Sequence, residues 1–205
     1  ARVPHPEADL ARRVKHKQHA GIGGQIGNMH EPARMACPIR HTGNGKGKTT
    51  AAWGTVTRAL GYGYKVGVVQ FIKGTWDCGE RNFLQQRCPE VPFIVMGSGF
   101  TWETQSRERD REAAQQAWQQ TKTLLTDASL HLVLLDELTY ILKYGYIDAE
   151  EVYEALRNRP REQSVIITGR GAPPALKELA DTVSMIDDKK HAFRAGIKAR
   201  KGVEY

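Results

Sequence analysis

The chain has 205 residues, of which 40% are hydrophobic and 26% charged, as expected for one globular domain. It has no apolar run near the roughly 18 residues of a membrane helix and no hydrophobic leader, so we expect no membrane association and a cytoplasmic location. Its net charge of +7 comes from basic ends (+4 for residues 1–41, +5 for 189–205, −2 between them), which indicates solvated tails and no nucleic-acid partner.

Residues 1–41 are expected to form an irregular or poorly ordered segment that ends in a degraded first strand. A phosphate-binding loop normally follows a buried strand. Residues 33–40, ARMACPIR, instead contain the charged Arg40 and Pro38, which has no backbone N–H for a sheet ladder. Two explanations stay open: a tail whose last residues still pair as a strand, or a segment altered by a reading-frame error or truncation.

Helices and apolar strands alternate between residues 42 and 188. The pattern predicts strands at residues 65–72, 91–97, 131–137, 164–169 and 182–186. It predicts helices at residues 49–60, 106–126 and 148–158, the second with Ala114, Trp118, Thr121 and Leu125 on one face. Short, continuously apolar strands between helices are typical of parallel βαβ units. We therefore predict an α/β core domain at 42–188, with a mainly parallel sheet of about five or six strands and helices on both faces. A basic tail, 189–205, follows it.

A glycine-rich loop lies at the start of this core. The segment TGNGKGKT, residues 42–49, matches the P-loop pattern G-x-x-x-x-G-K-[ST] in its last three residues and has Thr42 at the position of the first glycine. Glycines let backbone amides approach phosphate oxygens, Lys48 supplies a positive charge, and the Thr49 hydroxyl can reach Mg²⁺. The loop predicts polyphosphate binding and a P-loop NTPase-like fold; the alternative is a glycine-rich turn that binds nothing.

Two carboxylates follow the predicted strand at 131–137. In LVLLDE, Asp136 and Glu137 stand where a Walker B strand presents carboxylates to the Mg²⁺ beside a P-loop. They could also merely cap the next helix. The two motifs occur in the order expected on an alternating α/β pattern, which favours nucleotide binding.

A longer set of motifs resembles one family. The segments are TGNGKGKTTAAWGTVTRALGYG, VGVVQFIKGTW, GERNFL, GSGFTWETQ, VLLDELTY, VIITGRG, LADTVS and the KHAF to EY tail. In order and spacing they are similar to the ATP:corrinoid adenosyltransferases of bacterial vitamin B12 metabolism. The resemblance runs from about Thr42 to Tyr205, although the family usually has an apolar strand where this chain has ACPIRH.

The resemblance implies an unusual use of the P-loop. In this family the nucleotide lies reversed along the loop, and a corrinoid reduced to Co(I) attacks the ribose C5′ of ATP. The whole tripolyphosphate leaves, and an adenosylcorrinoid forms for adenosylcobalamin biosynthesis or salvage. Charge develops on the leaving triphosphate, where Lys48, the loop amides and Mg²⁺ would lie. No protein nucleophile or general base is needed.

The resemblance also implies roles for individual residues. Lys48, Thr49 and Glu137 are the expected catalytic residues. Mg²⁺ or Mn²⁺ is expected at Thr49, Glu137 and Asp136, directly or through water. The expected ATP contacts are Gly43, Asn44, Gly45, Lys46, Gly47, Lys48, Thr49, Thr50, Arg58 and Arg170. For the two arginines, a surface ion pair is the alternative, and Lys46 could equally be solvated.

Phe100 and Trp102 are the expected corrinoid contacts. They stand two residues apart on a glycine-rich stretch, and the resemblance implies that they displace the lower axial ligand, which makes Co(II) easier to reduce. Packing of Trp102 in the core is the alternative. His191 is expected to be a lid or surface residue, because an axial imidazole would oppose that reduction.

The resemblance implies further partners. They are a homodimer, a cobalamin, cobinamide or cobyrinic acid diamide substrate, and an electron donor such as a reduced flavin or flavoprotein. Two other functions remain: a phosphotransferase or ATPase that releases ADP, and a non-catalytic nucleotide-binding module.

Overall fold

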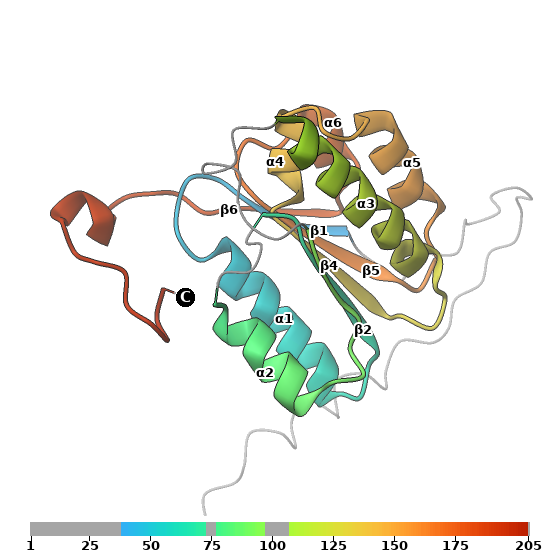
Figure 1. Ribbon diagram of the computed structural model, residues 1–205, viewed down its shortest axis with the longest axis horizontal. Coiled ribbons are helices and arrows are strands. Elements are labelled where there is room, and N and C mark those ends of the chain that lie inside the picture. Colours follow the sequence, from blue (N-terminus) through green and yellow to red (C-terminus); the bar gives the residue numbers. More distant parts are fainter. Residues whose placement is uncertain (1–37, 73–76, 97–106, 205) are drawn as a thin grey trace, which may run out of the picture. The chain divides into compact units, whose positions relative to one another are not determined.

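The computed structural model describes residues 38–72, 77–96 and 107–204, and among these a parallel sheet is surrounded by helices (Figure 1). The strands are β1 (Pro38–Thr42), β2 (Val66–Gln70), β3 (Phe93–Val95), β4 (Leu132–Asp136), β5 (Ser164–Thr168) and β6 (Thr182–Met185). The α-helices are α1 (Lys48–Gly61), α2 (Gly79–Arg87), α3 (Arg107–Thr126), α4 (Leu138–Lys143), α5 (Ala149–Asn158) and α6 (Pro174–Glu178). A 3-10 helix, η2 (Ala192–Ala195), follows in the tail.

The sheet has six strands in the order β3-β2-β4-β5-β1-β6, and all neighbouring pairs are parallel. The predicted α/β fold, with its parallel sheet, is therefore confirmed. Each parallel connection brings the chain back to the same edge, so the carboxyl ends of the strands, with the loops that follow them, gather at one side of the sheet.

Helices cover both faces of this sheet, as predicted (Figure 1). Successive side chains of a strand point to opposite faces, so Val68 and Val69 belong to different hydrophobic clusters. Val68 packs in the cluster that contains Trp53 of α1 and Leu84 of α2. Val69 packs in the cluster that contains Trp118 of α3, together with side chains from α4, α5 and α6.

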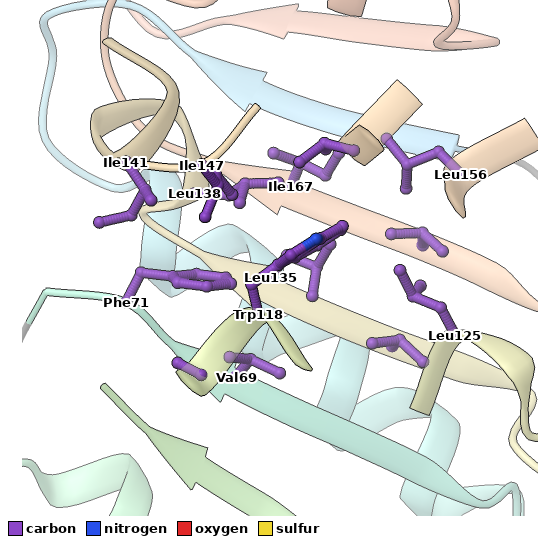
Figure 2. Close-up of a cluster of buried hydrophobic side chains, with 14 of the residues drawn as sticks. Val69, Phe71, Trp118, Leu125, Leu135, Leu138, Ile141, Ile147, Leu156 and Ile167 are labelled. Carbon is purple, nitrogen blue, oxygen red and sulfur yellow. The ribbon is translucent and has the colours of Figure 1, made fainter. Parts of the chain in front are cut away.

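The second cluster forms the larger part of the core (Figure 2). The stripe predicted on α3 faces it, since Ala114, Trp118, Thr121 and Leu125 are all at most 1% exposed. Thr121 tolerates this burial because its hydroxyl donates to the carbonyl of Ala117 at 2.7 Å, inside its own helix. The predicted helical period is therefore confirmed.

β1 is an inner strand between β5 and β6. Pro38 pairs with Val165 at the first position of the strand, where a missing N–H is tolerated best. The predicted first strand is thus present over residues 38–42, and the rest of the predicted segment, residues 33–37, lies outside the described residues.

The sequence pattern did not predict α2, α4 and α6, which have 9, 6 and 5 residues. Helices of fewer than about three turns are too short to display a clear helical period. No helix in the described ranges is long and apolar enough to cross a membrane.

Candidate functional site

The glycine-rich loop connects β1 to α1 at the carboxyl edge of the sheet. Gly43 and Gly47 have φ of 102° and 113°, a region that other residues rarely adopt. Gly47 immediately precedes α1, so Lys48 and Thr49 occupy the first turn of that helix. The amides of this turn have no partners within the helix and can therefore bind an anion.

The segment after β6 braces the loop from one side. The amide of Gly45 donates to the carbonyl of Ile186 at 2.7 Å, and the amide of Ile186 donates to the carbonyl of Thr42 at 2.8 Å. A Cβ at Gly43 would lie 2.5 Å from the Ile186 carbonyl oxygen, and one at Gly45 would lie 2.5 Å from that of Asp187. These two glycines are therefore required by close backbone packing.

Lys48 is buried at the centre of the site, with 6% of its surface exposed. Its Nζ donates to the carbonyl oxygen of Gly45 at 2.6 Å across the loop. Burial lowers the pKa of Lys48, an effect that Glu137 and Asp136 oppose and the charge of Arg170 reinforces. The structure therefore brings four of the predicted site residues, Lys48, Asp136, Glu137 and Arg170, into one electrostatic environment.

Asp136 is the last residue of β4 and is fully buried. Its Oδ1 accepts hydrogen bonds from the hydroxyls of Thr49 at 3.0 Å and Thr168 at 2.6 Å, and Gln70 Nε2 lies 3.4 Å from its Oδ2. A buried carboxylate needs such donors. The predicted neighbours Thr49 and Asp136 are thus in direct contact.

Glu137 follows in a left-handed conformation, with φ of 63°, as the N-cap residue of α4. Its amide donates to the hydroxyl of Thr168 at 2.9 Å. The position of a Cβ on Gly169 would lie 3.1 Å from Glu137 Oε2, so the carboxylate lies close over the chain that follows β5. The sequence predicted Asp136 and Glu137 as a pair of carboxylates. In the structure, Asp136 contacts Thr168 through its carboxylate, whereas Glu137 contacts Thr168 through its backbone amide.

The donor set fits a Mg²⁺ or Mn²⁺ ion. Mg²⁺ in nucleotide sites commonly takes one or two carboxylates and completes its shell with phosphate oxygens and water. Thr49 and Asp136 supply a hydroxyl and a carboxylate in contact, and Glu137 is the next residue. The described residues contain no group of three or more His, Cys, Asp or Glu side chains able to hold a metal, so a structural zinc site is not indicated there.

Other predicted nucleotide contacts are more exposed. Asn44, Lys46, Thr50 and Arg170 are exposed residues beside the loop or the strand ends, and Lys46 Nζ lies 3.8 Å from Glu204 Oε1. Arg58 lies in the last turn of α1, about 15 Å along the axis from Lys48, so the chain does not place it beside the loop. Phe100 and Trp102 lie outside the described residues.

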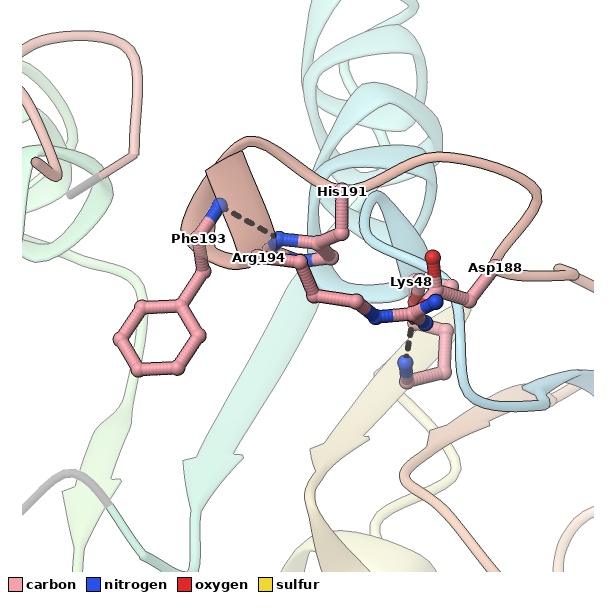
Figure 3. Close-up of polar contacts among 6 residues, drawn as sticks. Lys48, Asp188, His191, Phe193 and Arg194 are labelled. Carbon is pink, nitrogen blue, oxygen red and sulfur yellow. Dashed lines mark hydrogen bonds and ion pairs between the residues drawn. The ribbon is translucent and has the colours of Figure 1, made fainter. Parts of the chain in front are cut away.

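The basic tail returns to the site at its end. Lys201 donates to Asp77 at 2.7 Å, and residues 202–204 border a groove of about 370 Å³ between α1 and α2. In η2 the Nδ1 of His191 accepts from the amide of Phe193 at 3.2 Å, and Arg194 pairs with Asp188 (Figure 3). Nδ1 of His191 therefore forms a hydrogen bond within the tail itself.

Sequence reasoning missed Thr168 and Gln70. Both are almost fully buried, and both contact Asp136. A signal was available, since each is a polar residue that closes an apolar strand, in VIIT and VGVVQ. At the carboxyl ends of neighbouring parallel strands such residues meet.

The chain matches a known family and several curated proteins. The family described as ATP:corrinoid adenosyltransferase BtuR/CobO/CobP matches residues 37–205. A corrinoid adenosyltransferase of Escherichia coli (strain K12) is 60% identical over 167 residues, covering 82% of this chain and 84% of the relative. The corrinoid adenosyltransferase CobA of Salmonella typhimurium is 57% identical with the same coverage. A corrinoid adenosyltransferase of Pseudomonas aeruginosa is 53% identical over 201 residues, or 98% of both chains, so this alignment includes most of residues 1–41.

Proposed function

Because this chain belongs to the ATP:corrinoid adenosyltransferase family, it is an enzyme that transfers an adenosyl group, and we propose the following reaction for it. The Co(I) centre of a reduced corrinoid attacks C5′ of ATP, the C5′–O bond breaks, and tripolyphosphate leaves. Both electrons of the new cobalt–carbon bond come from Co(I). The observation that carries the proposal is the buried Lys48 at the end of the glycine-rich loop, where the charges of Asp136 and Glu137 act on it.

The site residues suit a leaving group that gains negative charge. As the C5′–O bond stretches, charge accumulates on the triphosphate, and groups already in place stabilise it without reorganisation. Lys48 would supply a full charge. The loop amides from Gly43 to Thr50 would supply partial charges, apart from the amide of Gly45, which already donates to Ile186. A Mg²⁺ or Mn²⁺ ion, held by Thr49 and Asp136 with help from Glu137, would add positive charge against the phosphates.

The nucleoside and outer phosphate contacts are proposed from exposed residues. Asn44 would contact the nucleoside. Arg170 would contact phosphate, because the charge of Arg170 already influences the pKa of Lys48. Lys46 would exchange its 3.8 Å contact with Glu204 for an exposed contact with phosphate, and an exposed contact of this kind contributes little. Arg58 has no comparable structural support as a phosphate contact, because it lies about 15 Å along α1 from Lys48 of the same chain.

The corrinoid would lie against Phe100 and Trp102, which displace its lower axial ligand. We also propose a homodimer, a cytoplasmic location, and a reduced flavin or flavoprotein as the electron donor. These expectations come from the sequence and the family resemblance.

Product analysis tests the reaction. ATP, Mg²⁺ and a chemically reduced corrinoid are incubated with the protein without oxygen, and the phosphorus products are followed by NMR. We expect tripolyphosphate in proportion to the corrinoid consumed, a light-sensitive organocobalt product, and no tripolyphosphate when the corrinoid is omitted. Formation of ADP without tripolyphosphate would contradict the proposal and support a phosphotransferase or ATPase.

Trp102→Ala separates the two substrates. We expect unchanged ATP affinity and a loss of about 10-fold or more in the rate of Co(II) reduction, because the axial ligand is no longer displaced. Transfer from a corrinoid supplied as Co(I) should be largely restored. Tyr62→Ala, which truncates a side chain 77% exposed at the end of α1, is the control. An equal loss of ATP affinity in Trp102→Ala would contradict separate sites.

A further inference from the structure

Thr168 joins the two carboxylate residues of the site through one hydroxyl group. It is the last residue of β5 and is fully buried. Its Oγ1 donates to Asp136 Oδ1 at 2.6 Å and accepts from the amide of Glu137 at 2.9 Å. Donating one hydrogen bond and accepting the other fixes the direction of the hydroxyl proton.

The bond to Glu137 matters because of the backbone conformation there. Among the described residues, Glu137 is the one non-glycine residue with positive φ. Such a conformation is unfavourable for a residue other than glycine and persists only where surrounding contacts impose it. The contact with Thr168 gives the Glu137 amide an acceptor. By holding the backbone at this residue, it also determines where the Glu137 side chain leaves the chain.

The bond to Asp136 fixes the other carboxylate. Thr168 and Thr49 donate to the same oxygen, Asp136 Oδ1. Thr49 comes before Asp136 in the sequence, and Thr168 comes after it. Loss of the Thr168 hydroxyl would remove a 2.6 Å hydrogen bond to this carboxylate, shorter than its contacts with Thr49 and Gln70, which would remain. It would also leave the Glu137 amide without this acceptor. Both changes act on groups that surround Lys48.

We propose that Thr168 is a positioning residue that sets the geometry of Asp136 and Glu137 for binding a divalent cation together with the triphosphate of ATP. The inference rests on the proposed function for the identity of the nucleotide. It needs no corrinoid, because the contacts of Thr168 with Asp136 and Glu137 lie within the protein.

The test compares Thr168→Val, which keeps the shape and removes the hydroxyl, with Thr168→Ser, which keeps the hydroxyl. Mn²⁺ is titrated into the full-length protein with ATP, without corrinoid, and bound Mn²⁺ is measured by electron paramagnetic resonance. We expect Thr168→Val to weaken Mn²⁺ binding about 10–100-fold, the usual effect of losing a group that orients a metal ligand. Thr168→Ser should restore affinity to near that of the unchanged protein.

Thr121→Val is the matched control. It also removes a buried threonine hydroxyl, one that donates to the carbonyl of Ala117 within α3. It should leave Mn²⁺ affinity unchanged. An equal loss in Thr121→Val and Thr168→Val, or no loss in a folded Thr168→Val, would overturn the inference.

A second variant covers failure to fold. If Thr168→Val does not fold, Thr168→Cys is used, because a thiol is a similar size and a weak donor. Weakened Mn²⁺ binding in Thr168→Cys supports the positioning role, and unchanged binding overturns it. If the unchanged protein binds no ATP with Mn²⁺, the proposed function fails, which is a different outcome.

Discussion

Lys48→Ala is expected to abolish measurable ATP binding and to lower kcat/KM for adenosyl transfer about 10²–10³-fold, as for loss of one group that stabilises transition-state charge. The ammonium group is buried, lies against the loop carbonyl of Gly45, and shares its surroundings with Asp136 and Glu137. Without it, two carboxylates face the triphosphate with less opposing charge. Calorimetric titration with MgATP and measurement of tripolyphosphate release check both parts.

Lys46→Ala is the matched control, two residues earlier in the same loop. Its side chain is 47% exposed and its contact with Glu204 is 3.8 Å long. Exposed pairs contribute about 0–1 kcal/mol, so we expect less than about a fivefold change. A loss in Lys46→Ala as large as in Lys48→Ala would contradict the central place given to Lys48.

The direction of the Lys48 pKa shift predicts stability as well. Burial lowers this pKa, so the fold disfavours the charged form. Below the folded pKa the side chain is charged in the folded and unfolded states, and the folded state carries the cost; this cost is relieved as the pH rises through the folded pKa towards the unfolded one. In the absence of ATP, the melting temperature of Lys48→Met should therefore be no lower than that of the unchanged protein. This measurement distinguishes a loss of ATP binding from a loss of folding.

The parts of the site that follow from local sequence were predictable. Lys48 and Thr49 stand at a fixed distance from the loop glycines, and Asp136 ends a strand that is apolar throughout. Backbone geometry then fixes where these residues lie, because a parallel strand and the next helix meet at the carboxyl edge of the sheet. Their contact, Thr49 to Asp136, joins residues 87 apart, and the prediction of it depended on both motifs, each of which can be identified from its own segment.

The parts that depend on distant segments were not predictable. Ile186 is 141 residues from Gly45 in sequence, and nothing in ADTVSMI marks it as the brace of the phosphate loop. Thr168 could have been a strand residue of no consequence until β4 and β5 were known to be neighbours. Glu137 was predicted as a second Walker B carboxylate, but its left-handed conformation and the contact of its amide with Thr168 could not be inferred from residue type.

The first strand illustrates how context overrides composition. Pro38 and Arg40 argue against a buried strand, yet β1 pairs on both sides. A proline at the first position of a strand costs the sheet few hydrogen bonds. The remaining residues of β1 pair with both β5 and β6. The Pseudomonas aeruginosa alignment, which includes most of residues 1–41, also favours an inherited segment over a reading-frame error.

Gly43→Ala is expected to destabilise the protein by more than the other loop glycine substitutions and to eliminate ATP binding. Two separate costs apply at this position. The backbone has φ of 102°, and the new Cβ would lie 2.5 Å from the carbonyl oxygen of Ile186. Since that carbonyl accepts from Gly45, the methyl group must displace the brace of the whole loop.

The other glycines of the region separate these costs. Gly47→Ala meets nothing within 4 Å but has φ of 113°, so it should carry the backbone cost alone, about 1–3 kcal/mol. Gly45→Ala has no unfavourable φ and should carry only the cost of the collision with the backbone of Ile186 and Asp187. Gly54→Ala, in the middle of α1 with open space around it, should instead stabilise the protein by up to about 1 kcal/mol. Urea unfolding of the four variants measures the order directly. A Gly43→Ala protein as stable as Gly54→Ala would mean that the segment after β6 does not brace the loop, and the close packing that makes Gly43 necessary would have to be abandoned.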